Sequence, residues 1–127
     1  MSIQAQVLDA LRKLIDDLGC YARVTVGPLP PEGGLSLAPS GGAAYATLSG
    51  GWSAALDVVL NARHERQAVA LEALCSIHEA LARRDDWPAG DGWQIVSVRP
   101  ASAPGYLDRE GGQWLYGSAL TLHYTAD

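Results

Sequence analysis

Residues 93–124, WQIVSVRPASAPGYLDREGGQWLYGSALTLHY, are the stretch that decides the fold of this chain. Trp93–Pro100 and Gln113–Tyr124 are rich in β-branched and aromatic residues, a composition typical of sheet strands. The prolines and glycines of residues 100–112 favour turns and interrupt strands. The segment therefore predicts two antiparallel strands joined by an ordered polar loop, and we expect the loop at 100–112 to project from the domain.

The N-terminal segment predicts an amphipathic helix. Its apolar residues recur at helical spacing and share one face: Val7, Leu8, Leu11, Leu14, Ile15 and Leu18. Ser2 is placed to cap the start of this helix, and Gly19 is placed to end it. The charged residues gather on the opposite face, which we therefore expect to be solvated.

Short strands are predicted between this helix and the next one. They occupy residues 21–26, 35–38, 43–49 and 53–61. In the last of these, the leucines and valine at 56, 58 and 60 alternate with Asp57 and Val59, as in a sheet with one buried face. The Pro- and Gly-rich stretch at 27–34 follows the first strand, and we expect it to form a second projecting loop.

A second helix is predicted over residues 65–84, with its apolar stripe running from Ala70 to Leu81 and Pro88 beyond its end. The expected order is therefore α-β-β-β-β-α-β-β. Helices segregated from a mostly antiparallel sheet indicate an α+β fold, with both amphipathic helices on one face of the sheet. At 127 residues the chain is expected to form a single domain, 1–127.

Composition excludes several functional classes. The net charge is −5 and the nine Lys and Arg residues are scattered, so we expect no specific nucleic-acid binding. Neither a signal peptide nor a continuous apolar run of about 18 residues is present, which predicts folding in the cytoplasm and no membrane segment. Cys20 and Cys75 are expected to be ordinary small apolar residues in a reducing compartment, with no disulfide indicated.

Candidate chemistry is sparse. Cys75 and His78 are spaced to reach one metal ion from a helix, but zinc needs three or four ligands and no second half-site has matching spacing. His64 and Glu65 suggest acid–base work, yet no nucleophile lies in a recognisable signature. We expect His78 at the margin of the core and His64 at a polar helix terminus.

The remaining polar motifs indicate turns and solvated loops. The glycine pairs at 41–42 and 50–51 lack the spacing and the lysine of a phosphate-binding loop. The loop carboxylates do not follow the alternating spacing of a calcium loop; they are Asp85, Asp86, Asp91, Asp108 and Glu110. We therefore expect no catalytic, cofactor-binding or metal-binding residues, no cofactor, and no enzymatic activity.

Aromatic residues concentrate near the final pair of strands. This arrangement is compatible with a ligand pocket, a layer of the core or a protein interface. We expect Trp93, Trp114 and Tyr116 to fix the sheet, and the residues in the predicted loops to meet partners. The interface candidates are Leu29, Pro31, Trp87, Tyr106, Leu107 and Arg109.

Several short segments together carry a resemblance that covers most of the chain from Leu35 onward. They are Leu35–Gly42, Val58–Gln67, Trp93–Ile95, Pro104–Leu107, Gln113–Tyr116 and Leu120–Tyr124. In this pattern the chain resembles the small minor capsid proteins of tailed phages and prophages, a group that is similar to the tail-terminator proteins. It departs from the family in lacking phenylalanine and in having Ala-rich strands.

The resemblance implies a structural role in the virion. Tail-terminator subunits form a ring, a hexamer in the assembled virion, that caps the tail tube and joins the tail to the head. The implied partners are further copies of the chain, the tail tube protein and a head-completion or connector protein. The implied location is the host cytoplasm during assembly and then the virion. Two alternatives stay open, a small ligand-binding or regulatory α+β module that uses the Trp/Tyr cluster and a small metal-dependent or hydrolytic enzyme.

Overall fold

A computed structural model describes residues 1–46 and 50–127, and the side chain of Tyr45 lies outside the description. The elements, in chain order, are helix α1 (Ile3–Asp16), strands β1 (Val24–Val26), β2 (Gly34–Ala46) and β3 (Trp52–His64), helix α2 (Gln67–Ala82), and strands β4 (Ala89–Gly90), β5 (Trp93–Glu110) and β6 (Gln113–Ala126).

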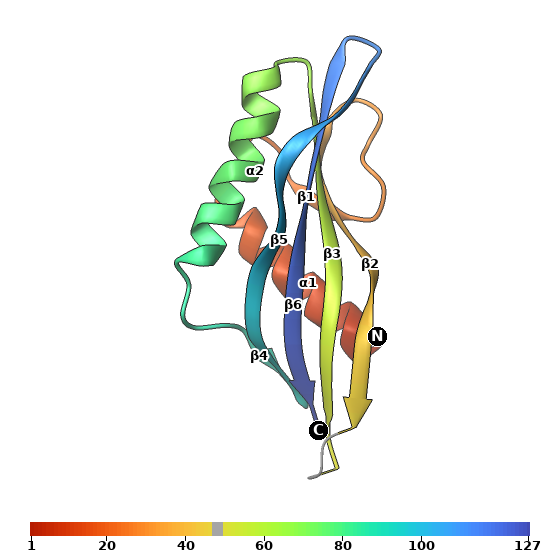
Figure 1. Ribbon diagram of the computed structural model, residues 1–127, viewed down its shortest axis with the longest axis vertical. Coiled ribbons are helices and arrows are strands. Elements are labelled where there is room, and N and C mark those ends of the chain that lie inside the picture. Colours follow the sequence, from red (N-terminus) through yellow and green to blue (C-terminus); the bar gives the residue numbers. More distant parts are fainter. Residues whose placement is uncertain (47–49) are drawn as a thin grey trace.

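The strands form one six-stranded sheet in the order β1-β2-β3-β6-β5-β4. β1 runs parallel to β2, and every other neighbouring pair is antiparallel. β2, β3, β5 and β6 are far longer than β1 and β4, and they form the body of the sheet (Figure 1). β3 and β6 pair without a register shift from Trp52 to His64, so the centre of the sheet is regular.

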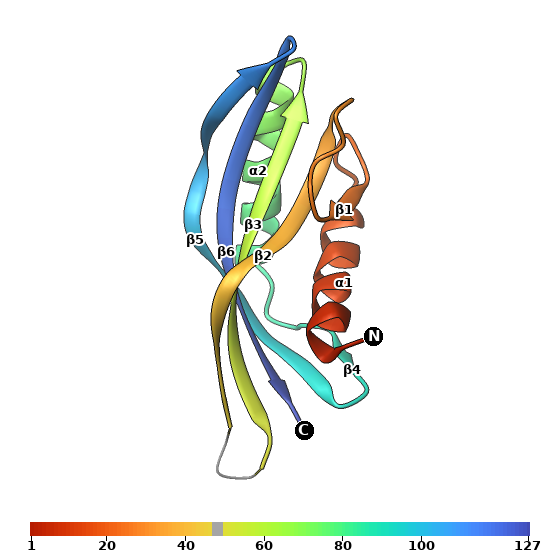
Figure 2. The same cartoon turned by 90° about the vertical axis from the view of Figure 1, so that its right-hand side faces the viewer.

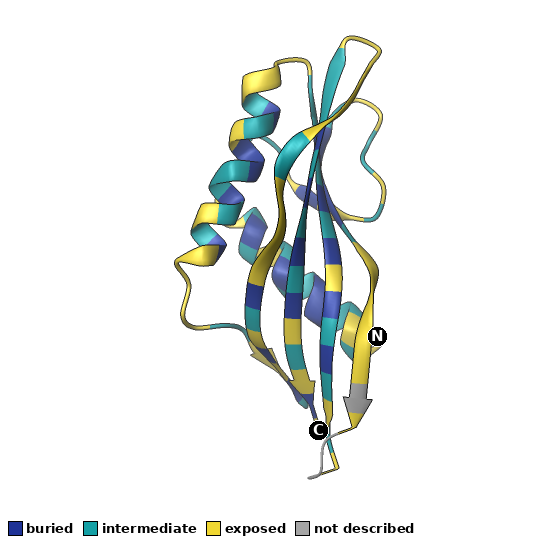
Figure 3. Ribbon diagram, in the orientation of Figure 1, coloured by how far each residue is buried: buried dark blue, intermediate teal, exposed yellow. Residues whose placement is uncertain are grey.

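Both helices lie on the same face of this sheet, and no helix of the described residues lies over the opposite face (Figures 1 and 2). The apolar core lies between the helices and the sheet. On β3, buried residues alternate with exposed or half-buried ones, as expected for a strand with a single covered face (Figure 3). The side chains of Val58, Leu60, Leu74, Ile77 and Leu120 are nearly or fully inaccessible to solvent.

The two helices differ in how far their surfaces are apolar. α1 begins where Ser2 Oγ accepts a hydrogen bond from the backbone N–H of Ala5, at 3.2 Å, as predicted. Its outer face is charged, and Asp9 forms ion pairs with Arg12 and Lys13. α2 buries one side on the sheet, but its flanks also carry apolar residues such as Val69, Leu71 and Ala80, all half-buried. Part of the α2 surface is thus suited to a further contact.

The predicted α+β class, with two helices and a mostly antiparallel sheet, is confirmed. The strands are divided differently along the chain. The strands expected at 35–38 and 43–49 belong to one strand, β2, because a bulge at Ser40 absorbs the Pro-Ser-Gly-Gly sequence without ending the strand. Residues 47–49 of that prediction lie outside the described part of the chain.

The prediction of a loop at 100–112 is wrong, because this segment is the outer part of the β5–β6 hairpin. Residues up to Glu110 belong to β5 and pair with β6, and only Gly111 and Gly112 form the turn. The prolines are accommodated because β5 has a free outer edge and register shifts between Pro100 and Ser102 and between Ser102 and Gly105. The second predicted loop is present, since residues 27–33 connect β1 to β2 outside any strand.

Candidate functional site

The sheet is larger than the two helices can cover. Its four long strands extend beyond the helices as two hairpins, β2–β3 at one end and β5–β6 at the other (Figure 2). The face of the sheet away from the helices carries small and polar residues on its central strands, including Ala55, Asp57, Ala119 and Thr121. Neither helix covers this face or the free parts of the outer edges of β2 and β5.

Three of the predicted interface residues lie together on the β5–β6 hairpin. Tyr106 is 54% exposed, and its ring makes edge contacts with Trp114 and Tyr116 at centroid distances of 6.1 Å each. The Arg109 guanidinium stacks over the Trp114 ring at 4.7 Å. These contacts hold exposed aromatic and cationic groups in a fixed arrangement.

Leu107 lies on the helix-free face of the sheet and is 56% exposed. A Cβ atom placed on Gly117 would lie 2.6 Å from Leu107 Cδ1 and 3.1 Å from Asn61 Oδ1, so Leu107 packs directly over this glycine. It sits in a register shift of β5, between Tyr106 and Asp108. The bulge turns an apolar side chain toward solvent at a defined place.

The loop at 27–33 is tied to the same end of the sheet. Arg63 Nη1 donates to the carbonyl of Pro30 at 3.1 Å, and Gln113 Nε2 donates to the carbonyl of Glu32 at 2.9 Å. In this loop Leu29 is half-buried and Pro31 is exposed. Leu29 and Pro31 therefore lie at the same end of the sheet as the β5–β6 hairpin, which the sequence alone did not indicate.

Arg63 also reaches the hairpin itself, because its Nη2 lies 3.9 Å from Glu110 Oε2. Tyr21, which precedes β1, fixes the end of the loop by donating to the carbonyl oxygens of Gly34 and Arg63, at 2.6 and 3.0 Å. Partial burial of its hydroxyl raises the pKa of Tyr21 to about 12. These bonds make the loop and the hairpin one structural unit.

The remaining aromatic residues divide as follows. Trp93 and Tyr116 are buried and Trp114 is half-buried, so the prediction that they fix the sheet is confirmed. Trp93 Nε1 donates to Gln6 Oε1 at 3.0 Å, which links β5 to α1. Trp87, an interface candidate, is half-buried against the core, with Arg84 5.8 Å from its ring, and it is not part of the loop and hairpin unit.

The residues considered for chemistry do not form a cluster. Within the described part of the chain, no group of three His, Cys, Asp or Glu side chains is arranged to hold a metal ion. His64 Nδ1 accepts from the backbone N–H of Arg66 at 2.9 Å, which gives it a local role at the start of α2. Burial lowers the pKa of His78, whereas burial and the nearby Glu72 and Glu79 carboxylates raise the pKa of Cys75. The Cys75 environment thus favours the thiol over the nucleophilic thiolate.

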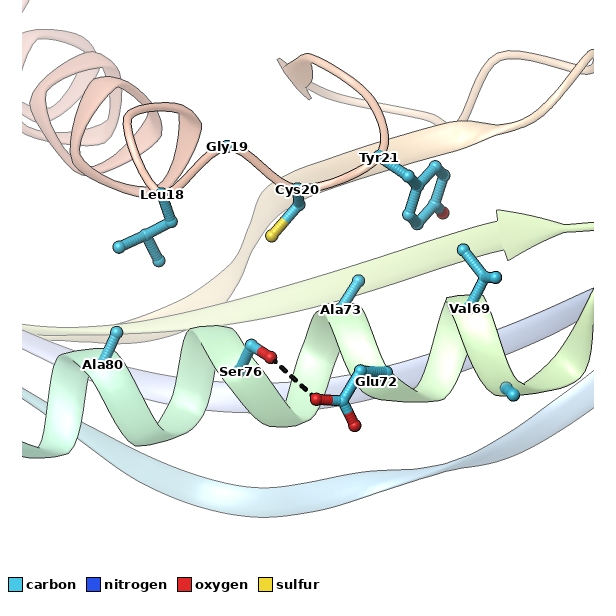
Figure 4. A pocket seen from close by; sticks show the side chains of 10 residues that line it. Leu18, Gly19, Cys20, Tyr21, Val69, Glu72, Ala73, Ser76 and Ala80 are labelled. Atoms are coloured by element: carbon cyan, nitrogen blue, oxygen red, sulfur yellow. Dashed lines mark hydrogen bonds between the residues drawn. The ribbon is translucent and has the colours of Figure 1, made fainter.

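An apolar groove runs between α2 and the segment that follows α1 (Figure 4). It has a volume of about 660 Å³, with Leu18, Cys20 and Tyr21 on one wall and Val69, Ala73 and Ala80 of α2 on the other. The polar groups in it are few; Ser76 Oγ donates to Glu72 Oε1 at 3.2 Å. Of the Trp/Tyr cluster that suggested ligand binding in the sequence, none lines this groove.

The outer edge of β2 is a feature that sequence reasoning missed, because a break was expected at residues 39–42. The stretch Gly41–Ala46 has no charged residue and no proline. In an edge strand, this composition leaves backbone groups accessible to another strand. The run of small residues is visible in the sequence, but only the pairing of the strand shows that this run lies at an edge of the sheet.

Comparison with known proteins adds no relative. No protein-family model matches the chain, and no curated protein matches it. Neither helix of the described residues has the length and hydropathy required to span a bilayer.

Proposed function

We propose that the chain is a structural subunit of a tailed phage or prophage virion, of the tail-terminator or minor capsid type. Copies of it form a ring, a hexamer in the virion, that caps the tail tube and joins the tail to the head. The subunit is made in the host cytoplasm, carries no cofactor and is not an enzyme. Its partners are further copies of itself, the tail tube protein and a head-completion or connector protein, with no specific nucleic acid and no membrane.

The observation that carries this proposal is the uncovered area of the sheet. Strands in globular proteins commonly have about five or six residues. Here β2 and β3 have 13 residues each, β5 has 18 and β6 has 14. Two helices cover one face of these strands only in part, which leaves a face, two edges and two hairpins for other chains. Such a surface suits a subunit of an assembly better than a free monomer.

The loop and hairpin unit gives the subunit a second contact region, separate from the sheet edges. Tyr106, Leu107 and Arg109 are of the types enriched at protein interfaces, and they are held in place by Trp114 and Gly117. Tyr106 and Arg109 lie on the face of the hairpin that carries Trp114 and Tyr116, and Leu107 lies on the opposite, helix-free face. A hairpin with fixed, partly apolar groups on both faces is suited to contact with the tail tube or with a head protein. The net charge of −5 also suits a channel that passes DNA without retaining it.

The test is electron microscopy of the purified chain mixed with tail tubes of the tube protein encoded in the same genome. We expect a ring with a central channel at the tube end. A Leu107→Ser variant should bind tubes at least ten-fold more weakly, whereas Leu18→Ser, an exposed leucine away from the hairpin, should bind as the parent does. A monomer that never joins tubes, under conditions where tubes form, would refute the proposal.

The groove beside α2 favours one alternative, a small ligand-binding or regulatory module. Its size and its apolar walls are those of a site for a small apolar molecule. An environment-sensitive apolar dye tests this directly. Under this alternative the dye binds the parent with micromolar affinity, and Val69→Trp, which fills the groove, abolishes binding without affecting tubes. Binding of the dye unchanged by Val69→Trp would remove the groove from consideration.

A further inference from the structure

The two outer long strands are covered at one end only. β1 pairs with Leu35–Leu37 of β2, and β4 pairs with Trp93 and Gln94 of β5. Beyond these short partners, the outer edge of β2 through Ala46 and that of β5 through Glu110 have no strand beside them among the described residues.

The hydrogen bonds at the covered ends show which backbone N–H and C=O groups of β2 and β5 point outward, away from the sheet. Leu37 accepts from Gly27 N at 2.8 Å, so its carbonyl points away from β3. Outward groups recur at every second residue, so the carbonyl of Pro39 also points outward, and after the bulge at Ser40 the next outward groups belong to Gly42 and Ala44. On β5, Ile95 N donates outward to Pro88 O at 3.1 Å. The same alternation along β5, with a bulge at Val96, places backbone groups that point outward at Val98 and Pro100.

These two free stretches overlap along the sheet at Gly42, and Ala44 and Ala46 lie level with Ile95 and Trp93, which β4 and Pro88 already cover. Gly42 is opposite Leu56, Leu56 is opposite Leu122, and Leu122 is opposite Val98. One row of cross-strand neighbours therefore connects the free stretch of β2 with that of β5. Two copies related by a rotation about an axis along the strands would bring these edges together, and a two-residue displacement along the strands places Ala43 opposite Arg99 and Ala44 opposite Val98, clear of β4. The stagger needed to close a tilted sheet is accommodated by a shift of a few residues.

The strand directions also fit. β2, β3, β6 and β5 are successively antiparallel, so β2 and β5 run in opposite directions. When copies stand side by side in the same orientation, β5 of one is antiparallel to β2 of the next. The alternation of the sheet then continues from copy to copy. This contact joins two different patches, as a ring requires.

The two edges differ in how they are protected. The Gly41–Ala46 edge of β2 carries no charge and no proline, and is open to pairing. β5 is interrupted by Pro100, Pro104 and several register shifts, so only Ser97–Pro100 can form a regular ladder. Pairing of two β5 edges is thus disfavoured, whereas one short β5 stretch can add to an open β2 edge. A ladder this short predicts weak association of free subunits and firm association on a tube, where contacts act together.

We propose that the Gly41–Ala46 edge of β2 in one copy forms an antiparallel ladder with Ser97–Pro100 of β5 in the next copy. Each copy then contributes β2, β3, β6 and β5 to one continuous sheet around the ring. The inference rests on the proposed ring-forming function and names the surface that joins its subunits.

Disulfide cross-linking on assembled tube ends tests this joint. In a background with Cys20→Ala and Cys75→Ala, one preparation carries Ala43→Cys and another carries Ser97→Cys, or Arg99→Cys for a two-residue stagger. Ala43 and Ser97 are on one cross-strand row, through Ala55 and His123. The matched control replaces Ser97→Cys by Thr121→Cys, because Thr121 is on β6, one strand in from the edge.

Under copper phenanthroline we expect mixed dimers of Ala43→Cys with Ser97→Cys or Arg99→Cys, at ten-fold or greater yield over the Thr121→Cys control. Cross-links only between Ala43→Cys copies would mean a twofold β2–β2 contact and would overturn the proposed joint. Rings visible by electron microscopy without mixed dimers would also overturn it, while leaving the ring function intact. Absence of rings from the same grids would reject the ring function itself.

Discussion

Replacing Gly42 by alanine adds a single methyl group and tests how closely β2 approaches β3 beside the free edge. Gly42 has φ of +140°, and a Cβ atom there would overlap the carbonyl oxygen of Ala55 and lie 3.0 Å from Leu56 Cα. Both are backbone atoms of the central strand β3, so no side-chain rotation relieves the overlap. Gly41, next to it, has φ of +133° but nothing within 4 Å of the added methyl group. Gly41→Ala is therefore a matched control that carries the backbone strain without the overlap.

The magnitudes separate the two variants. A positive φ costs alanine about 1–3 kcal/mol of the free energy of unfolding. The lower entropy of the unfolded chain with alanine in place of glycine offsets about 0.4–1 kcal/mol of this cost. We therefore expect Gly41→Ala to lose about 1–2 kcal/mol of the free energy of unfolding. Forcing β2 away from β3 adds about 1–3 kcal/mol, so Gly42→Ala should lose about 2–5 kcal/mol. For a domain of this size, the difference of about 1–3 kcal/mol lowers Tm by a further ~4–11 °C.

Thermal and urea unfolding followed by circular dichroism measure both variants. Equal stability of Gly41→Ala and Gly42→Ala would refute the described approach of β2 to β3, and with it the position of the free edge. A large loss in Gly41→Ala alone would place the bulge elsewhere along β2.

Further predictions concern the core and one titrating group. Leu74→Ala, at a fully buried position, should lower the free energy of unfolding by about 2–5 kcal/mol, whereas Leu107→Ala should change it by less than about 0.5 kcal/mol in urea unfolding. Ser36 is 1% exposed and its Oγ has no hydrogen-bond partner among the described residues, so Ser36→Ala should leave Tm equal or higher. The pKa of Tyr21 is about 12 in the folded chain and about 10 when unfolded, so folding favours the protonated hydroxyl. Its contribution to the free energy of unfolding is therefore complete below pH 10 and is lost as pH rises toward 12. At pH 8, Tyr21→Phe should be less stable than the parent by about 1–2 kcal/mol. Its free energy of unfolding should also fall less than that of the parent between pH 10 and pH 12; an equal fall in both proteins would contradict this prediction.

The fold class was predictable because the helical patterns are strong. The apolar residues of α1 share one face, and Ser2 caps it, so its local sequence and its packing agree. The alternation at Leu56, Val58 and Leu60 likewise gave the correct buried face of β3. These are local patterns whose period alone determines which side meets the core.

The errors concern places where tertiary pairing overrides local turn signals. Pro39 and Gly41–Gly42 would end an isolated strand, yet pairing with β3 across a bulge keeps β2 continuous. Pro100 and Pro104 mark a loop in sequence, yet they lie in β5, where a free edge requires no N–H from Pro100. The union of the 27–33 loop with the β5–β6 hairpin depends on Arg63 and Gln113, whose long-range partners no local pattern indicates.

The most direct test of the central claim, that copies join through the sheet edges, is a cryo-electron microscopy map of the chain on the end of its tail tube. We expect a ring whose wall is an unbroken antiparallel sheet, with β2, β3, β6 and β5 from each copy in that order. A ring whose copies meet only through α1 or α2, with β2 and β5 edges apart, would contradict it.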